Sequence, residues 1–225
     1  MIKSSLGVVV FYNPTDEVVS MKKELSEMSL EELWELFPII LKKHNPNYKE
    51  WYEIEERQLF SCIKNQDIKR INHIGSSAVE GLIAKPTVDI LLEVDNNCDI
   101  TRLIEILKMN SWILMSSEHE PDLKLVFNKG YTPDGFAEKV YHLHVRYLGD
   151  WNELYFRDYL LDHADVAVQY GNLKLSLWKE YEHNRDGYTE AKSDFIMRYT
   201  EKAKFEYAGR YITSKMSIPV ITKTQ

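Results

Sequence analysis

The sequence predicts an α/β protein in which an N-terminal and a C-terminal helical layer enclose a central sheet within one domain. Residues 70–148 consist mainly of short segments that are typical of strands. The span 134–218 contains no proline and has mostly helical spacing, whereas six of the seven prolines precede it. With 225 residues, the chain is long enough to bury a substantial core.

Two helices are predicted before the sheet. Ser29 to Glu32 form a capping box ahead of an apolar stretch, and Pro38 ends or kinks this helix. Asn45-Pro46 begins the second helix, with proline at the first helical position, where its missing N–H costs nothing. The apolar side of the second helix is formed by Trp51, Ile54, Leu59, Cys62 and Ile63. Its polar side carries Glu53, Glu55, Glu56 and Arg57.

Strands are predicted over 70–74, 87–94, 112–116, 123–127 and 140–147, with a short helix over 103–107. Alternation along 87–94 places Asp89, Leu91 and Glu93 on one face. The same alternation along 140–147 groups His142, His144 and Arg146. Polar side chains therefore gather on one face of two strands.

Three helices are predicted after the sheet. The first spans 151–161, with Asp150 and Glu153 as its cap. The apolar positions of the second are Leu173, Leu177, Trp178 and Tyr181, and those of the third are Phe195, Ile196, Tyr199 and Ala203.

Charge and cysteine content narrow the functional classes. The chain has 28 Lys and Arg against 35 Asp and Glu, a net charge of −7, which disfavours duplex nucleic acid but permits a nucleotide. The apolar run Val8–Tyr12 is too short for a signal peptide or a membrane span, so we expect a cytoplasmic protein with no membrane partner. Cys62 and Cys98 lack metal-binding or redox spacing and are expected to be buried thiols.

The segment 72–94 is typical of phosphate handling. A strand leads into Gly75-Ser76-Ser77, where glycine permits backbone N–H groups to approach an anion and the serine hydroxyls add donors. Asp89 follows early on the next strand, where a carboxylate can hold a divalent cation that bridges phosphate oxygens. The alternative is a tight turn followed by a strand-edge carboxylate.

Four ordered motifs resemble the GrpB family, within the nucleotidyltransferase-fold superfamily. They are His73–Ile90, which contains Gly-Ser-Ser and Lys-Pro-Thr-Val-Asp, and then His142–Val145, Phe156–Leu160 and Tyr188–Lys192. The resemblance covers roughly 45–207. It suggests a family domain over 45–210, an N-terminal extension with a helix over 1–44 and a C-terminal tail over 211–225.

The resemblance implies a mixed sheet flanked by helices, with a Gly-Ser pair that holds a nucleoside triphosphate and an Asp-x-Asp/Glu strand that holds two metal ions. Gly75, Ser76 and Asp89 match this pattern, but Leu91 occupies the second acidic position. Glu93 shares the face of Asp89 but stands about 13 Å along the strand, whereas paired metal ions lie about 3.5–4 Å apart. A full two-metal mechanism is therefore not expected.

His142 and His144 are candidates to complete a metal site with Asp89. Their spacing lets two imidazoles approach one ion, and imidazole favours Mn²⁺ or Zn²⁺ over Mg²⁺. The alternative is a polar cleft lined by two hydrogen-bonded histidines. Lys85, Arg146 and Lys192 lie in or next to the matched motifs and are candidate phosphate ligands, although a residue of this type is more often a solvated surface charge.

The sequence is compatible with two principal functions and with a third alternative. The first is a metal-dependent nucleotidyltransferase in which Gly75, Ser76 and Ser77 hold a nucleoside triphosphate and Asp89 holds Mg²⁺, Mn²⁺ or Zn²⁺. Glu93 is the candidate general base, and the acceptor is an unknown small molecule. The second is a nucleotide- or cofactor-binding module without transfer activity, which Leu91 favours and which assists coenzyme A or other nucleotide metabolism. A third is a protein-interaction role for the acidic segment 16–56.

Overall fold

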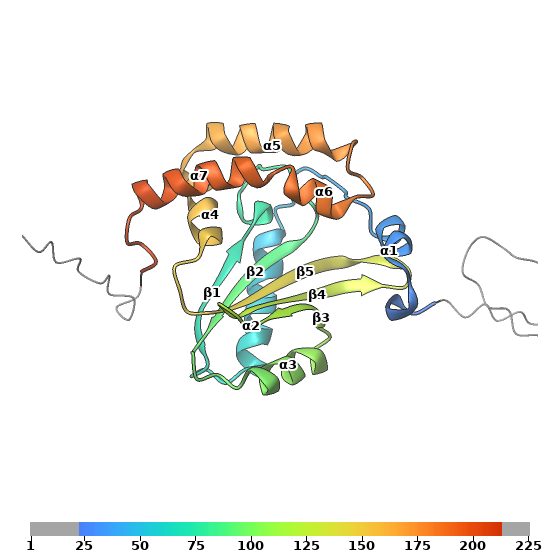
Figure 1. The fold of residues 1–225 in the computed structure, drawn as a ribbon, viewed down its shortest axis with the longest axis vertical. Coiled ribbons are helices and arrows are strands. Elements are labelled where there is room, and N and C mark those ends of the chain that lie inside the picture. Colours follow the sequence, from blue (N-terminus) through green and yellow to red (C-terminus); the bar gives the residue numbers. More distant parts are fainter. Residues whose placement is uncertain (1–22, 213–225) are drawn as a thin grey trace, which may run out of the picture.

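The computed structural model describes residues 23–212 and contains one five-stranded sheet with helices on both faces (Figure 1). The strands are β1 (Ile68–Ile74), β2 (Val88–Val94), β3 (Ile113–Glu118), β4 (Lys124–Thr132) and β5 (Gly135–Tyr147). The helices are α1 (Leu30–Leu36), α2 (Tyr48–Cys62), α3 (Ile100–Met109), α4 (Asn152–Asp162), α5 (Ala164–Trp178), α6 (Arg185–Glu190) and α7 (Ser193–Glu206). Two 3-10 turns, Leu25–Glu27 and Ser76–Ala78, complete the elements.

The sheet has the strand order β1-β2-β5-β4-β3 and is mixed, as the resemblance to the GrpB family implies. The neighbouring strands β2 and β5 are parallel, whereas β1 with β2, β4 with β5, and β3 with β4 are antiparallel. In this register Asp89 lies beside His142 on one side and beside Ile74 on the other. The central parallel pair therefore brings together two motifs that are more than fifty residues apart in the sequence.

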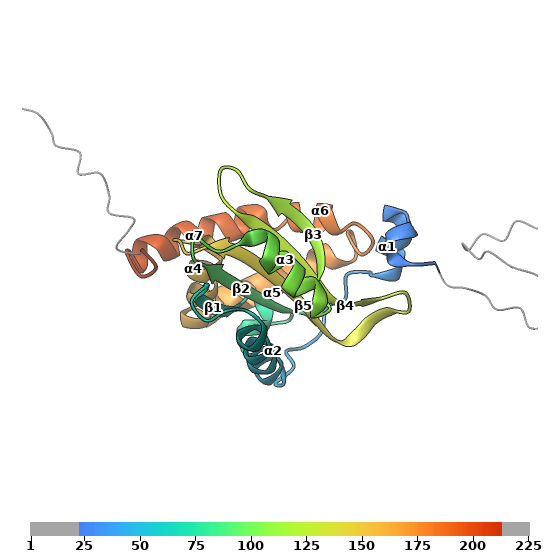
Figure 2. The same cartoon turned by 90° about the horizontal axis from the view of Figure 1, so that it is seen from below.

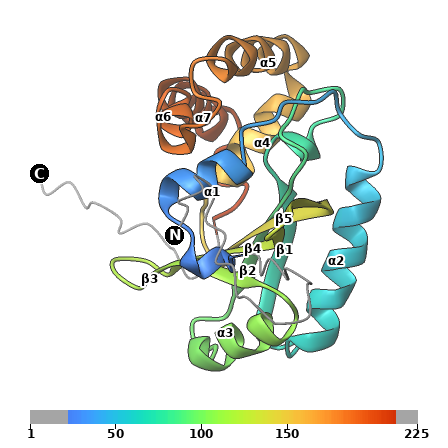
Figure 3. The same cartoon turned by 90° about the vertical axis from the view of Figure 1, so that its right-hand side faces the viewer.

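The two faces of the sheet carry different helical layers. On one face, α2 and α3 pack against Val88, Ile90 and Leu92 to form the main core (Figure 2). On the other face lie α4 to α7, with Leu91 packed between Ile74 and Leu154 (Figure 3). Since side chains alternate along a strand, Asp89 and His142 face the α4–α7 layer.

Residues 37–42 are packed into the domain. Phe37 is 7% exposed and Ile39 is 3% exposed. The carbonyl of Ile39 accepts a hydrogen bond of 2.5 Å from Trp178 Nε1, and Lys42 forms a backbone bridge with Ala84. Part of the segment that the sequence assigns to an N-terminal extension thus holds the loop before β2.

Several helix ends differ from the sequence prediction. The capping box of Ser29 and Glu32 is present. However, α2 begins at Tyr48 with Asn47 as its N-cap, so Pro46 precedes the helix. Trp151 is the N-cap of α4, without a side-chain cap, because the Asp150 carboxylate accepts a hydrogen bond of 2.6 Å from the Tyr155 hydroxyl.

The C-terminal layer has four helices where three were expected. The motif around Tyr188 forms the separate short helix α6, which Asn184 caps through the Gly187 N–H.

The predicted polar side of α2 is wrong at Glu55, which is 3% exposed and accepts a hydrogen bond of 2.7 Å from Lys129. A cross-element ion pair lets this carboxylate be buried against the sheet.

The structure also bears on the cysteines and on membrane-spanning segments. Both cysteines are free thiols, with Cys98 buried and Cys62 partly buried. Within residues 23–212, no helix has the length and apolar character that crossing a bilayer requires.

Candidate functional site

A chain of hydrogen bonds runs from β2 through β5 to β4 and α6. Asp89 Oδ1 lies 3.0 Å from His142 Nδ1, and His142 Nε2 lies 2.9 Å from the Tyr131 hydroxyl. Arg185, at the start of α6, donates to the same hydroxyl over 3.0 Å. Burial lowers the pKa of His142 to about 4, so the ring is neutral at pH 7, donates from Nδ1 and accepts at Nε2.

The Asp89 carboxylate is ionised in this setting. Burial by itself would raise the pKa of Asp89, but the hydrogen bond from His142, together with the electrostatic interactions with His142, His144 and His73, holds the pKa below its usual value. The site therefore contains one negative charge, held in place by an uncharged imidazole.

The glycine of the Gly-Ser-Ser turn lies directly against this carboxylate. Gly75 has φ +70°, and a Cβ built on it would come within 2.4 Å of Asp89 Oδ2. The turn continues into Ser76–Ala78, where the Ser77 hydroxyl lies 3.0 Å from His73 Nε2. His73 in turn stacks on Tyr52 of α2, so Ser77 is turned toward the opposite helical layer.

Lys174 connects α5 to the turn. It is 3% exposed, and its ammonium group donates to Ser76 Oγ over 2.9 Å and to the carbonyl of Ile83. Burial, with a contribution from the nearby Lys192, lowers the pKa of Lys174 to about 7.

Two further lysines approach the same region. Lys85 Nζ lies 3.5 Å from the Tyr131 hydroxyl and 5.3 Å from the centre of the Phe136 ring. Lys192, the N-cap of α7, places its Nζ 4.0 Å above the ring of Tyr188. Burial lowers the pKa of Lys85 to about 7 and that of Lys192 to about 8. Both lysines interact electrostatically with Asp89.

The structure does not bring Asp89, His142 and His144 together as metal ligands. Within residues 23–212, no three side chains of Asp, Glu, His or Cys are grouped so that they could hold a metal ion. Both ring nitrogens of His142 have hydrogen-bond partners, and His144 lies two residues further along β5, beside Leu91. The donor set thus fits neither a three-ligand site nor a pair of carboxylates.

Two other predicted site residues make contacts away from Asp89. Glu93 is fully buried, and its oxygens accept from Arg70 Nε over 2.5 Å, from Arg70 Nη2 over 2.7 Å and from the Gly149 N–H over 3.1 Å. Because the carboxylate is fully buried and paired with Arg70, it does not face a substrate as a general base would. Arg146 donates to the carbonyls of Val145 and Leu125 and lies 3.8 Å from Glu153.

The neighbouring motif Phe156–Leu160, in the middle of α4, fastens this helix to the sheet through Arg157. Arg157 donates to Asn72 Oδ1 over 2.9 Å and to the carbonyl of His73. It also pairs with Asp158 over 2.7 Å.

Three residues of the site are absent from the sequence prediction: Tyr131, Lys174 and Arg185. Lys174 gives a signal in retrospect, because it continues the buried side of α5 that contains Val166, Ala167, Tyr170 and Gly171. Tyr131 lies four residues beyond the predicted end of its strand, and Arg185 precedes a motif recognised only from Tyr188 onward. Neither of these two has a pattern that separates it from a surface residue.

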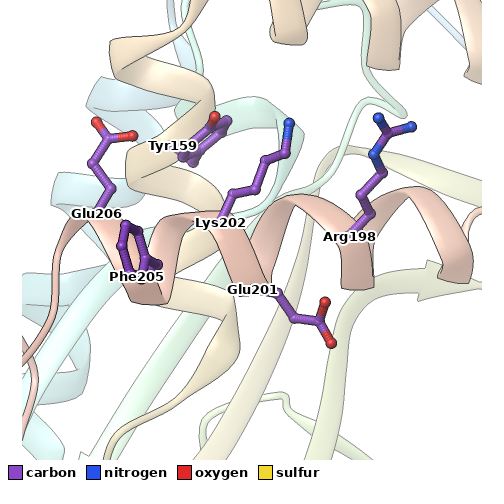
Figure 4. Close-up of a pocket in the computed structure, with 6 residues that line it drawn as sticks. All are labelled: Tyr159, Arg198, Glu201, Lys202, Phe205 and Glu206. Carbon is purple, nitrogen blue, oxygen red and sulfur yellow. The ribbon is translucent and has the colours of Figure 1, made fainter.

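The pocket in Figure 4 is a separate feature on α4 and α7. Its lining residues are Tyr159, Arg198, Glu201, Lys202, Phe205 and Glu206. In the picture, Glu201 points away from Arg198 and Lys202. The pocket shares no residue with the Asp89 site, and its charges have mixed signs.

A mixed sheet with a Gly-Ser turn against an aspartate on the adjacent strand defines an α/β protein and is consistent with the nucleotidyltransferase fold class. The sequence profile of the GrpB protein family matches residues 38–202. The chain belongs to the GrpB family.

Individual relatives agree with this assignment. The chain is 34% identical over 161 residues to the glutamate-rich protein GrpB of Alkalihalophilus pseudofirmus, an alignment that covers 70% of this chain and 91% of that protein. A UPF0157 protein of Pseudomonas aeruginosa is 36% identical over 137 residues, which are 59% of this chain but 54% of that protein. The crystal structure of the conserved protein GrpB from Enterococcus faecalis superposes with a TM-score of 0.65 at 26% identity. That superposition covers 75% of this chain and 99% of the other.

Proposed function

We propose that the Asp89 site binds the phosphates of a nucleoside triphosphate and supports transfer of the nucleotidyl group to a small-molecule acceptor. The observation that carries this proposal is the gathering of Lys85, Lys174, Lys192 and Arg185 around one carboxylate, beside the Gly75–Ser76 turn. Clustered cations with hydroxyl and backbone donors are the chemistry that recognises phosphate groups. The fold class of the GrpB family makes a nucleotide the favoured phosphate carrier.

In this proposal the triphosphate lies against the turn, with Ser76 and Lys174 near one phosphate and Lys85, Lys192 and Arg185 near the others. An acceptor hydroxyl, amine or phosphate attacks the α-phosphorus, and the bond between the α-phosphorus and the oxygen that bridges it to the β-phosphorus breaks. Pyrophosphate leaves, and the proton of a hydroxyl or amine acceptor passes to solvent water. The cations neutralise the charge that develops on the phosphoryl oxygens. No step of this proposal uses a metal ion, because the side chains of residues 23–212 do not fit the expected ligand set. The proposed setting is the cytoplasm.

A second candidate function is nucleotide binding without transfer. The observation that favours it is Leu91, which is fully buried against Ile74 and Leu154 at the position where the superfamily pattern has a second acidic residue. The Glu93 carboxylate, tied to Arg70, does not replace it. Such a module would present a nucleotide or cofactor to another enzyme.

The test is a thermal-shift panel of the four common nucleoside triphosphates, each with Mg²⁺ or Mn²⁺, followed by a pyrophosphate-release assay. A ligand at a hundred times its Kd adds about 2.7 kcal/mol, which for a chain of this size raises Tm by roughly 5–10 °C. Lys192→Met should lose the shift, and Lys179→Met, which alters an exposed lysine after α5, should keep it. Binding with pyrophosphate release supports transfer, and binding without release across an acceptor panel supports the second candidate. No shift with any nucleotide would overturn both.

A further inference from the structure

Four buried or half-buried cations around Asp89 lack a carboxylate partner. Among residues 23–212, no salt bridge within 4.0 Å involves Lys85, Lys174, Arg185 or Lys192. Elsewhere in the domain the buried carboxylates are paired, for example Glu93 with Arg70. A buried cation without a counterion is costly, so the arrangement is incomplete without an anion.

The charge balance of the cluster points to a multiply charged anion. Four cations face one carboxylate, which leaves an excess of three positive charges when the lysines are protonated. The carboxylate is also engaged, since Asp89 Oδ1 accepts from His142 and Oδ2 lies against Gly75. A single inorganic phosphate carries at most about two charges at neutral pH, so it would leave the cluster unbalanced.

The cations are positioned before any ligand arrives. Lys174 uses two acceptors, Ser76 Oγ and the Ile83 carbonyl, and an ammonium group has three N–H donors, so one remains for a ligand. Lys192 lies over the ring of Tyr188, whose buried hydroxyl has no hydrogen-bond partner in the described part of the chain. A donor held in place in this way loses little entropy on binding.

We infer that the site binds a triphosphate group without a divalent cation, because Lys85, Lys174, Arg185 and Lys192 supply the charge neutralisation that a metal ion would otherwise provide. This inference rests on the proposed function and specifies that the triphosphate binds in its metal-free form. Asp89 then acts as an anchor for His142, and the negative charge of Asp89 opposes the ligand.

Two probes test the inference by titration calorimetry: inorganic tripolyphosphate, which carries only the phosphates, and ATP. Each is titrated into the native protein in EDTA and again in excess Mg²⁺. The variants are Asp89→Asn, Lys174→Met and Lys192→Gln, with the exposed Lys179→Gln as the matched control. Lys192→Gln is included because Lys174 is buried, and its replacement can unfold the local structure. Circular dichroism establishes that each variant is folded.

The expected result is a Kd in EDTA within about threefold of the Kd in Mg²⁺, for both probes. Asp89→Asn should bind as tightly or up to about tenfold more tightly, because it removes a like charge. Lys174→Met and Lys192→Gln should each weaken binding by about tenfold or more, and Lys179→Gln should not. Binding that requires Mg²⁺ and disappears in Asp89→Asn would overturn the inference but leave the proposed function intact. No binding of either probe in any condition would overturn both.

Discussion

Gly75 and Asp89 approach each other so closely that a side chain at position 75 would take the space of the carboxylate. The Cβ of any other residue there would come within 2.4 Å of Asp89 Oδ2, and Gly75 also has φ +70°. The position therefore demands glycine for two separate reasons, which are contact and backbone conformation. Gly75 directly follows β1, whose last residue, Ile74, pairs with Asp89 of β2.

A comparison of two glycines separates these reasons. Gly75→Ala should destabilise the protein by about 2–4 kcal/mol, because strain at positive φ adds to the clash with Asp89. Gly81 has φ +76° but nothing within 4 Å of its Cβ position, so Gly81→Ala should cost only about 1 kcal/mol. Urea unfolding of both variants measures the difference. Equal losses would show that the contact with Asp89 has no energetic effect.

The buried ion pair between Arg70 and Glu93 makes a second prediction. Arg70→Met should lower the free energy of unfolding by about 3–5 kcal/mol, because it leaves the fully buried Glu93 carboxylate without its partner. The double variant Arg70→Met/Glu93→Leu should recover most of this loss, since no uncompensated charge remains. Denaturant unfolding of the single and double variants is the measurement. A double variant as unstable as Arg70→Met would argue that packing, and not the charge, causes the loss.

The lysines predict the pH dependence of triphosphate binding. Burial lowers the pKa of Lys85 and Lys174 to about 7 and that of Lys192 to about 8, so these groups lose their charge between pH 7 and pH 9. A bound anion favours the protonated lysines, so the complex holds more protons and affinity falls as the pH rises. Above about pH 7 the phosphates themselves are already ionised.

We expect the Kd to increase by about tenfold or more from pH 7 to pH 9, measured by titration calorimetry. Lys192→Gln should show a shallower slope over the same range. Calorimetry in two buffers of different ionisation enthalpy should also detect proton uptake on binding. An affinity that is constant over this range would contradict the assignment of these lysines to the ligand.

The burial of Leu91, which occupies the second acidic position of the superfamily pattern, leads to a further prediction. Leu91→Asp should destabilise the domain by about 3–5 kcal/mol or prevent folding, because it places a carboxylate in the fully buried contact with Ile74 and Leu154. Leu91→Met preserves the volume and should cost less than about 1.5 kcal/mol. Thermal unfolding of both variants tests this. A stable Leu91→Asp protein that binds Mn²⁺ would show that the position still accommodates a metal ligand.

Local patterns were sufficient to predict most of the fold. The alternation around Asp89 and His142 identified β2 and the C-terminal part of β5 and assigned both residues to polar faces. The capping box at Ser29 correctly marked the start of α1. These patterns depend on residues that are close together in the sequence, and the Gly75-Ser76 pattern that predicts the turn is one of them.

The missing parts of the site depend on distant contacts. Lys174 reaches Ser76 across 98 positions in the sequence, and Arg185 reaches Tyr131 across 54. Glu93 and Arg146 have the residue types expected of functional groups, but their roles follow from partners that local spacing does not identify. Charge and spacing alone therefore could not separate binding residues from structural ones.

The packing of Ile39 has a consequence for the order in which the chain acquires its structure. During synthesis from the N-terminus, Ile39 leaves the ribosome long before Trp178, its hydrogen-bond donor 139 residues further along the chain. Residues 37–42 can therefore reach their packed position only after α5 has been synthesised. Lys42, which bridges to Ala84, belongs to the same segment. Because residues 37–42 hold the loop that carries Lys85, we expect this loop to become fixed only after α5 has been synthesised.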